Sequence, residues 1–197
     1  MNRRNAIKYS AWFAGLGLLT PGVLASLQSC QKSNPGETWI PLRLNKAQVD
    51  QLIKLSDIIL PATRTPSASD VKVHQFVDLL MADVLSGEQV TSIQDGLATL
   101  DTISRSETQT SFEEITSEDA TDLVSRIDAE AFRDDPSGDM DAGFLENYRY
   151  LKALILMTYF TSEQGVRQNL NYVVIPGEYK ACMDLPEDGR VMVGNHM

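Results

Sequence analysis

Apolar residues recur every three or four positions along much of this 197-residue chain, which is the spacing of one face of an α-helix. The first such pattern follows Asn45, whose side chain can cap a helix together with Gln48, and it stops at Pro61. A polar loop with a second proline, Pro66, comes next. The same apolar spacing predicts further helices over 73–84, 90–103, 116–132 and 144–165.

The last of these segments, FLENYRYLKALILMTYFTSEQG, is the most apolar part of the expected domain. From Leu154 to Phe160 it is apolar nearly all round, which predicts a helix in the middle of a bundle or beneath a partner protein. Gly165 is placed to cap its C-terminal end. The following segment, 169–190, contains tyrosines, a Pro-Gly turn and irregular spacing, and no run of strands is evident. We therefore predict a single small all-α domain over 45–197, with an extended C-terminal segment that packs on a partner.

The N-terminal segment 1–29 has a different pattern. Arg3, Arg4 and Lys8 precede a mostly apolar run over 11–26. A membrane-spanning helix needs about 20 apolar residues, and this run is shorter. Its glycines and proline also disfavour a structural helix, since each costs roughly 1 to 3 kcal/mol relative to alanine. We therefore predict that residues 1–29 are an export signal peptide.

Two short motifs refine this prediction. Arg3 and Arg4, followed by NAIK, resemble the twin-arginine export motif, with Asn2 and Ala6 in place of the usual Ser or Thr and Phe. The sequence LQSC, which ends at Cys30, resembles a bacterial lipobox, in which the cysteine is acylated and the chain is cut before it. An ordinary buried or disulfide-bonded cysteine is the alternative.

With a lipobox, residues 30–44 become a lipid anchor and tether. One acyl chain binds a membrane only marginally, whereas two or more hold a protein there. We therefore expect an exported, lipid-anchored protein of the bacterial cell envelope that faces the periplasm.

Charge and cysteine content narrow the function further. The chain has 17 basic and 27 acidic residues, a net charge of −10, and loss of Arg3, Arg4 and Lys8 with the signal would leave −13. Such a surface repels nucleic acid and anionic lipid headgroups. Cys182 then remains as a lone thiol that cannot form an internal disulfide, and we expect it to be a small buried residue.

Motifs for cofactor or metal chemistry are missing from the sequence. It has no glycine-rich dinucleotide or phosphate loop, no haem-attachment motif and no zinc-protease motif. The acidic stretch 134–141 fails the EF-hand template, because Asp134 and Asp135 are adjacent and Pro136 intrudes. His74 is expected on the surface of its helix. We therefore predict no catalytic, cofactor-binding or metal-binding residues on this chain.

Two stretches together resemble one known family. LIKLSDIILPATRTPSASDVKVHQFVDLLMADVL and YLKALILMTYFTSEQGVRQNLNYVVIPGEYKAC are similar to the small (third, or gamma) subunit of gluconate 2-dehydrogenase and its relatives. The resemblance spans roughly residues 45 to 185. The positions that match the family are Pro61, Pro66, Tyr159, Gly165, Tyr172, Pro176, Gly177, Tyr179 and Cys182.

For most of these positions a scaffold role is the first interpretation, because prolines and glycines fix turns and tyrosines fill cores. All of them except Cys182 are also candidates for a partner interface. Contact with a partner is as good an interpretation as scaffold for Tyr172 and Tyr179.

The resemblance implies a non-catalytic accessory and chaperone subunit. Its partner would be an FAD-dependent flavoprotein of the glucose-methanol-choline type that oxidises a sugar or sugar acid. In such complexes electrons often leave through a cytochrome c subunit, which would carry haem c on a third chain. The small subunit would help the flavoprotein mature and leave the cell. The alternatives are a free-standing lipoprotein that binds a ligand or scaffolds an envelope complex and, less favoured, an enzyme in its own right.

Overall fold

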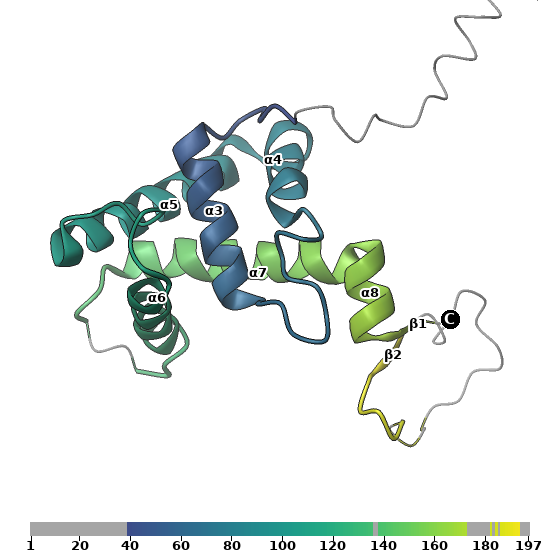
Figure 1. Ribbon diagram of the computed structural model, residues 1–197. Coiled ribbons are helices and arrows are strands. Elements are labelled where there is room, and N and C mark those ends of the chain that lie inside the picture. The colour runs from purple at the N-terminus through teal and green to yellow at the C-terminus, as the bar shows by residue number, and fades with distance from the viewer. Residues whose placement is uncertain (1–38, 136–137, 173–181, 183, 185, 194–197) are drawn as a thin grey trace, which may run out of the picture. The chain divides into compact units, whose positions relative to one another are not determined.

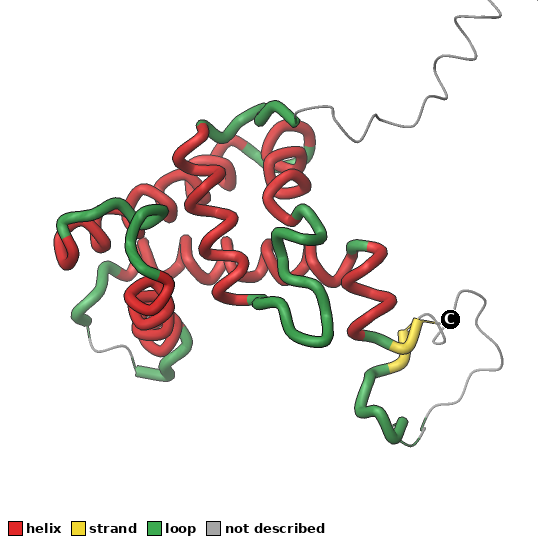
Figure 2. Tube along the Cα trace, viewed as in Figure 1, coloured by secondary structure: helices red, strands yellow, loops and turns green. Residues whose placement is uncertain are grey.

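The structure is a computed structural model that describes residues 39–135, 138–172, 182, 184 and 186–193. The predicted signal and lipid site, with Arg3, Arg4, Lys8 and Cys30, lie outside the described residues. The chain separates into two units, Met1–Ile40 and Pro41–Met197, and the description below concerns the second. Its helices are α3 (Lys46–Ile59), α4 (Val73–Asp83), α5 (Gly87–Thr108), α6 (Ser117–Ala131), α7 (Ala142–Thr161) and α8 (Glu163–Asn169) (Figures 1 and 2).

The all-α prediction is confirmed, and α7 is the central helix. It packs against α3, α4, α5, α6 and α8 (Figure 1). Leu151 and Ile155 on α7 are completely or almost completely buried. They belong to a core whose largest buried members also include Leu52, Leu55, Met81, Ile93, Leu97, Leu100, Phe112 and Ile127. The nearly all-apolar segment of α7 therefore lies in the middle of a bundle.

Polar side chains set where the helices begin. Asn45 and Gln48 form a reciprocal capping box at α3, in which each side chain accepts the other's backbone N–H at 3.0 Å. A second box, between Ser86 and Gln89, starts α5 earlier than the apolar spacing indicated. Each such cap contributes about 1 kcal/mol to stability.

No helix in the described part of the chain is long and apolar enough to cross a membrane.

Helix α4 buries only part of the apolar face that the spacing predicted. Phe76 and Val84, which the apolar spacing placed in the core, are 40% and 70% exposed, whereas His74 and Asp78 are buried. The expectation that His74 lies on the surface was therefore wrong. The physical reason is that three backbone N–H groups just before α3 require an acceptor.

Asp78 fixes the chain segment that leads into α3. Its carboxylate is fully buried and accepts the backbone N–H groups of Leu42, Arg43 and Leu44 at 2.6, 2.9 and 2.9 Å. A buried carboxylate is tolerated where several donors satisfy it. These three bonds hold Asp78 inward, while Phe76 and Leu79 beside it are 40% and 44% exposed.

The segment after α8 contains one feature that the sequence did not indicate. Strands β1 (Asn171–Tyr172) and β2 (Met192–Val193) form a short parallel pair, with Asn171 opposite Met192 and Tyr172 opposite Val193. Both strands lie within the C-terminal segment that was predicted to be extended, although no strand was predicted there. Strands of two residues lie below the length at which periodicity can be read.

Candidate functional site

The corner between α7 and α8 brings together several of the predicted site residues. Ser162 ends α7 and also starts α8, because its side chain accepts the backbone N–H of Gly165 at 3.0 Å. The same hydroxyl donates to the carbonyl oxygen of Tyr159 at 2.7 Å. The long helix predicted over 144–165 is therefore broken at Ser162.

Gly165 is needed for the close approach of the two helices at this corner. A Cβ atom at this position would lie 2.0 Å from the carbonyl oxygen of Tyr159 and 2.7 Å from Oγ of Ser162. No side chain tolerates the first of these distances, because the obstacle is backbone. The prediction of Gly165 as a C-terminal cap was wrong, since the Ser162 cap starts a new helix before it.

Tyr159 joins three segments that are far apart in the sequence. Its side chain is 2% exposed, and its hydroxyl donates to the carbonyl oxygen of Pro66 at 2.7 Å. The hydroxyl also accepts an N–H of the Asn169 side chain at 3.1 Å, and Asn169 donates in turn to the carbonyl of Gly165 at 2.9 Å. The loop after α3, the end of α7 and the end of α8 are thus held by one side chain.

The loop between α3 and α4 has its own internal support. Asp57 accepts the N–H of Ser69 at 2.8 Å, and Asp70 accepts the N–H of Ser67 at 2.9 Å. Ala68 is completely buried. These contacts hold the loop in one conformation against the α7–α8 corner.

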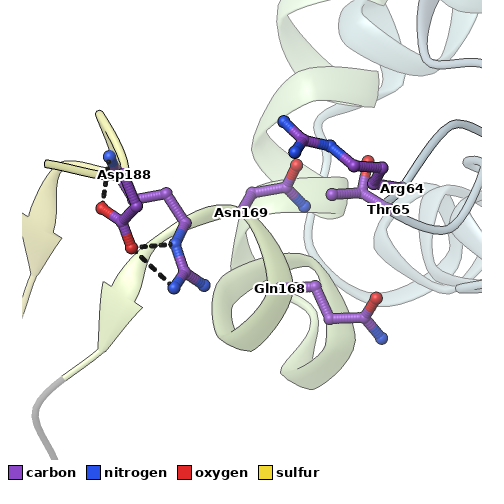
Figure 3. Close-up of a pocket in the computed structure, with 6 residues that line it drawn as sticks. Arg64, Thr65, Gln168, Asn169 and Asp188 are labelled. Carbon is purple, nitrogen blue, oxygen red and sulfur yellow. Dashed lines mark hydrogen bonds and ion pairs between the residues drawn. The ribbon is translucent and has the colours of Figure 1, made fainter.

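An open hollow of about 420 Å³ lies beside this corner (Figure 3). In Figure 3, Arg64 and Thr65 lie on one side of it, Asp188 lies on the other, and Gln168 and Asn169 lie between. Arg190 completes the lining and pairs with Asp188 at 2.7 Å. The backbone N–H of Arg190, and then its guanidinium, hold the pKa of Asp188 below its usual value.

Comparison with protein families gives one match, to gluconate 2-dehydrogenase subunit 3 over residues 46–177. The chain belongs to this family. The matched region begins with α3, includes the α7–α8 corner, and ends before the turn that carries Asp188 and Arg190. Comparison with curated proteins and with solved structures finds no match.

The family-matching positions divide into buried and exposed groups. Tyr159 and Gly165 are buried within this chain and hold the corner together. Pro61 is exposed, and Pro66 is partly exposed. Tyr172, directly after α8, is 48% exposed and lines a second open hollow beside α8.

The remaining predicted positions lie in the C-terminal segment of this subunit 3 relative. Pro176, Gly177 and Tyr179 are outside the described residues. Cys182 is exposed, so the expectation of a buried thiol was wrong. The sequence reasoning missed Asn169 and Asp57, whose roles depend on loop contacts that no periodicity shows.

Tyr148 and His74 are two further buried titratable groups of the subunit. Burial, and then the nearby Asp128 carboxylate, raise the pKa of Tyr148, whose hydroxyl donates to Asp128 at 3.1 Å. Burial lowers the pKa of His74. Within the described residues, no group of three His, Cys, Asp or Glu side chains could hold a metal ion.

Proposed function

We propose that this chain is a non-catalytic accessory subunit that accompanies an FAD-dependent dehydrogenase of the glucose-methanol-choline type. The observation that carries the proposal is the family match, which covers most of the helical body and describes a subunit of a dehydrogenase complex. The FAD belongs to the partner, which would oxidise a sugar or sugar acid. A cytochrome c subunit with haem c would be a third chain.

The surface near the α7–α8 corner is our candidate for the partner interface. Met157 and Phe160 on the last turns of α7 are 49% and 38% exposed, and Tyr172 follows α8. Aromatic and methionine side chains of this kind are enriched in protein interfaces. The corner beneath them is fixed by Tyr159 and Gly165, so the surface is presented in one conformation before a partner binds, which lowers the ordering cost of association.

The sequence of the first 30 residues supports a role in export. FAD must be inserted before a flavoprotein leaves the cytoplasm, so the flavoprotein has to cross the membrane folded. The twin-arginine route carries folded proteins, and Arg3 and Arg4 match its motif. We propose that this signal serves both proteins and that Cys30 then anchors the complex to a membrane facing the periplasm.

The experiment is co-expression of the full chain with its proposed flavoprotein partner, with and without Arg3→Lys and Arg4→Lys. We expect both proteins to reach the periplasm with the native signal and both to stay in the cytoplasm with the lysine pair. The reason is that the pair is recognised as guanidinium groups and not as charge alone. Retention of this chain alone would contradict co-export.

The catalytic part of the proposal is tested on the same preparations. The complex should contain FAD and reduce a dye with a sugar or sugar acid, while the isolated chain should do neither. Turnover or a stoichiometric cofactor on the isolated chain would refute the accessory role. If this chain were recovered from native membranes without any flavoprotein, that result would instead favour the free-standing lipoprotein. The supporting observation for that alternative is the open hollow lined by Arg64 and Arg190.

A further inference from the structure

Four of the six residues that line the hollow of Figure 3 carry side-chain N–H donors, while Asp188 supplies a carboxylate and Thr65 a hydroxyl. Arg64 and Arg190 contribute guanidinium groups, and Gln168 contributes a side-chain amide. The whole chain has a net charge of −10, so two arginines around one hollow run against the average charge of the surface. Such a concentration of donors suits an anion.

Arg64 supplies the charge that is available to a ligand. Other arginines pair with carboxylates of this chain, namely Arg105, Arg126, Arg133, Arg167 and Arg190. Among the residues that the structure describes, none provides a carboxylate partner for Arg64. Its planar guanidinium therefore retains the fork of N–H donors that matches a carboxylate in a bidentate pair.

Arg190 supplies a positioned donor with little net charge. Its Nε and Nη2 both bind Oδ2 of Asp188, at 2.8 and 2.7 Å, which leaves Nη1 outside this pair. The C-terminal end of α8 contributes a partial negative charge of about half an elementary charge. That is smaller than the full charge of Arg64, so the lining as a whole remains positive.

Asn169 gives the hollow a fixed wall. Its side-chain nitrogen donates to both Tyr159 and Gly165, so the amide cannot rotate freely. This connects the hollow to the corner that holds the loop of Arg64. The Asp188 side is held through β1, where the backbone N–H of Asn171 donates to the carbonyl oxygen of Val191 at 3.0 Å.

We propose that this hollow is a binding site for a carboxylate group, paired with Arg64 and further bonded by Arg190 and Gln168. The carboxylate belongs either to a small hydroxylated acid or to an acidic side chain of a bound protein. The site goes beyond the proposed accessory function, which needs no such ligand. The turn with Asp188 and Arg190 lies outside the family-matched region, so the family match does not account for the site.

The test is an NMR titration of the full chain at low ionic strength, with the Nε–H signals of Arg64 and Arg190 as the readout. The probes are D-gluconate, N-acetyl-L-glutamate amide, inorganic phosphate and, without a charge, D-glucose. We expect saturable shifts with both carboxylates at millimolar concentration and none with glucose. Low salt is required because exposed charges are screened.

Matched variants separate the site from general charge effects. Arg64 is exposed, so Arg64→Gln should weaken carboxylate binding about two- to fivefold, the range for one exposed ion pair. Arg43→Gln removes the same charge from another exposed position and should leave binding unchanged. A thermal melt of each variant verifies that the fold is retained.

Each result of the titration either identifies the source of the carboxylate or overturns the proposal. Gluconate binding at least tenfold tighter than the glutamate derivative would identify a free hydroxy acid as the ligand, and equal binding would identify the carboxylate alone, as on a partner's side chain. Absence of saturable shifts, equal shifts with glucose, equal affinity for inorganic phosphate, or equal loss in Arg43→Gln would overturn the proposal. None of these measurements involves a flavoprotein, so their failure leaves the accessory function untouched.

Discussion

The helical body and the α7–α8 corner are stabilised in different ways. The body, from α3 to α7, buries many apolar side chains, and no single one of them determines its arrangement. The corner depends on three particular atoms or groups: the absent side chain of Gly165, the hydroxyl of Tyr159 and the amide of Asn169. A distributed core tolerates conservative changes, whereas a corner built from single contacts does not.

The body also contains one position where a single side chain determines the geometry, and that side chain is polar. Asp78 satisfies three backbone N–H groups of the segment 42–44 from a fully buried position. Loss of its carboxylate would leave those donors without an acceptor, which costs more than removal of an apolar contact of similar size. The two regions therefore share a principle: buried polar contacts determine geometry, while apolar burial supplies most of the stabilisation.

The largest effect is expected from a bulky side chain at Gly165. Gly165→Val should destabilise the fold by about 4 kcal/mol or more, because its Cβ would meet the Tyr159 carbonyl oxygen at 2.0 Å and backbone must move. Chemical denaturation measures the change.

The control is Gly96→Ala in α5, where the nearest atom, Cβ of Asn147, would be 3.5 Å away. That distance is ordinary contact, and alanine favours helix by up to about 1 kcal/mol. Equal destabilisation by the two substitutions would remove the distinction between corner and body.

The second-largest loss of stability is expected at Asp78, the buried carboxylate of the body. Asp78→Ala should cost about 3 kcal/mol, since three backbone donors lose their acceptor. Hydrogen exchange should show faster exchange at Leu42, Arg43 and Leu44 than elsewhere in the body. Asp83→Ala, at an exposed position of the same helix, should change stability by less than about 0.5 kcal/mol. Unchanged protection at the three amides would contradict the role of Asp78.

A smaller loss is expected when the corner keeps its shape but loses one hydroxyl. Tyr159→Phe removes the bonds to Pro66 and Asn169 and should cost about 1 to 2 kcal/mol. Local exchange should increase in the loop 61–70 more than in the core helices. Tyr150→Phe on the same helix is the matched control and should leave stability nearly unchanged. An equal loss of stability in Tyr150→Phe would show that the hydrogen bonds of Tyr159 do not stabilise the corner.

The same contrast explains how much of the fold and site the sequence could predict. Apolar spacing and capping residues located the helices of the body, because these signals are local. Periodicity could not show that Asp78 turns inward, because its partners lie about 35 residues away. Gly165 and Tyr159 were selected through family resemblance, but their buried roles depend on Ser162 starting a new helix. The hollow with Arg64 and Arg190 joins segments more than 120 positions apart, which sequence reasoning did not connect.

The smallest effect, and the one that extends the comparison to pH, concerns His74 in the body. Burial lowers its pKa below the ordinary 6.5, the Asp57 carboxylate partly opposes this shift, and Lys72 adds to it. Below pH 6.5 the unfolded chain binds a proton at His74 that the folded chain does not. Stability should therefore fall as the pH drops from 6.5 towards the lower folded pKa, and the loss should be complete below that value.

His74→Gln should remove this part of the pH dependence, because glutamine does not titrate. The measurement is the unfolding free energy between pH 7.5 and 5 for the wild-type chain, His74→Gln and His196→Gln. Carboxylates lose their charge at lower pH and affect all three proteins alike, so the difference between the proteins isolates one histidine. If His196→Gln flattened the profile as much as His74→Gln, or if the wild type gained stability on acidification through this range, the buried neutral state of His74 would be refuted. If the unfolding free energy became independent of pH only in His74→Gln, the body, like the corner, would contain one polar group whose environment the apolar pattern does not reveal.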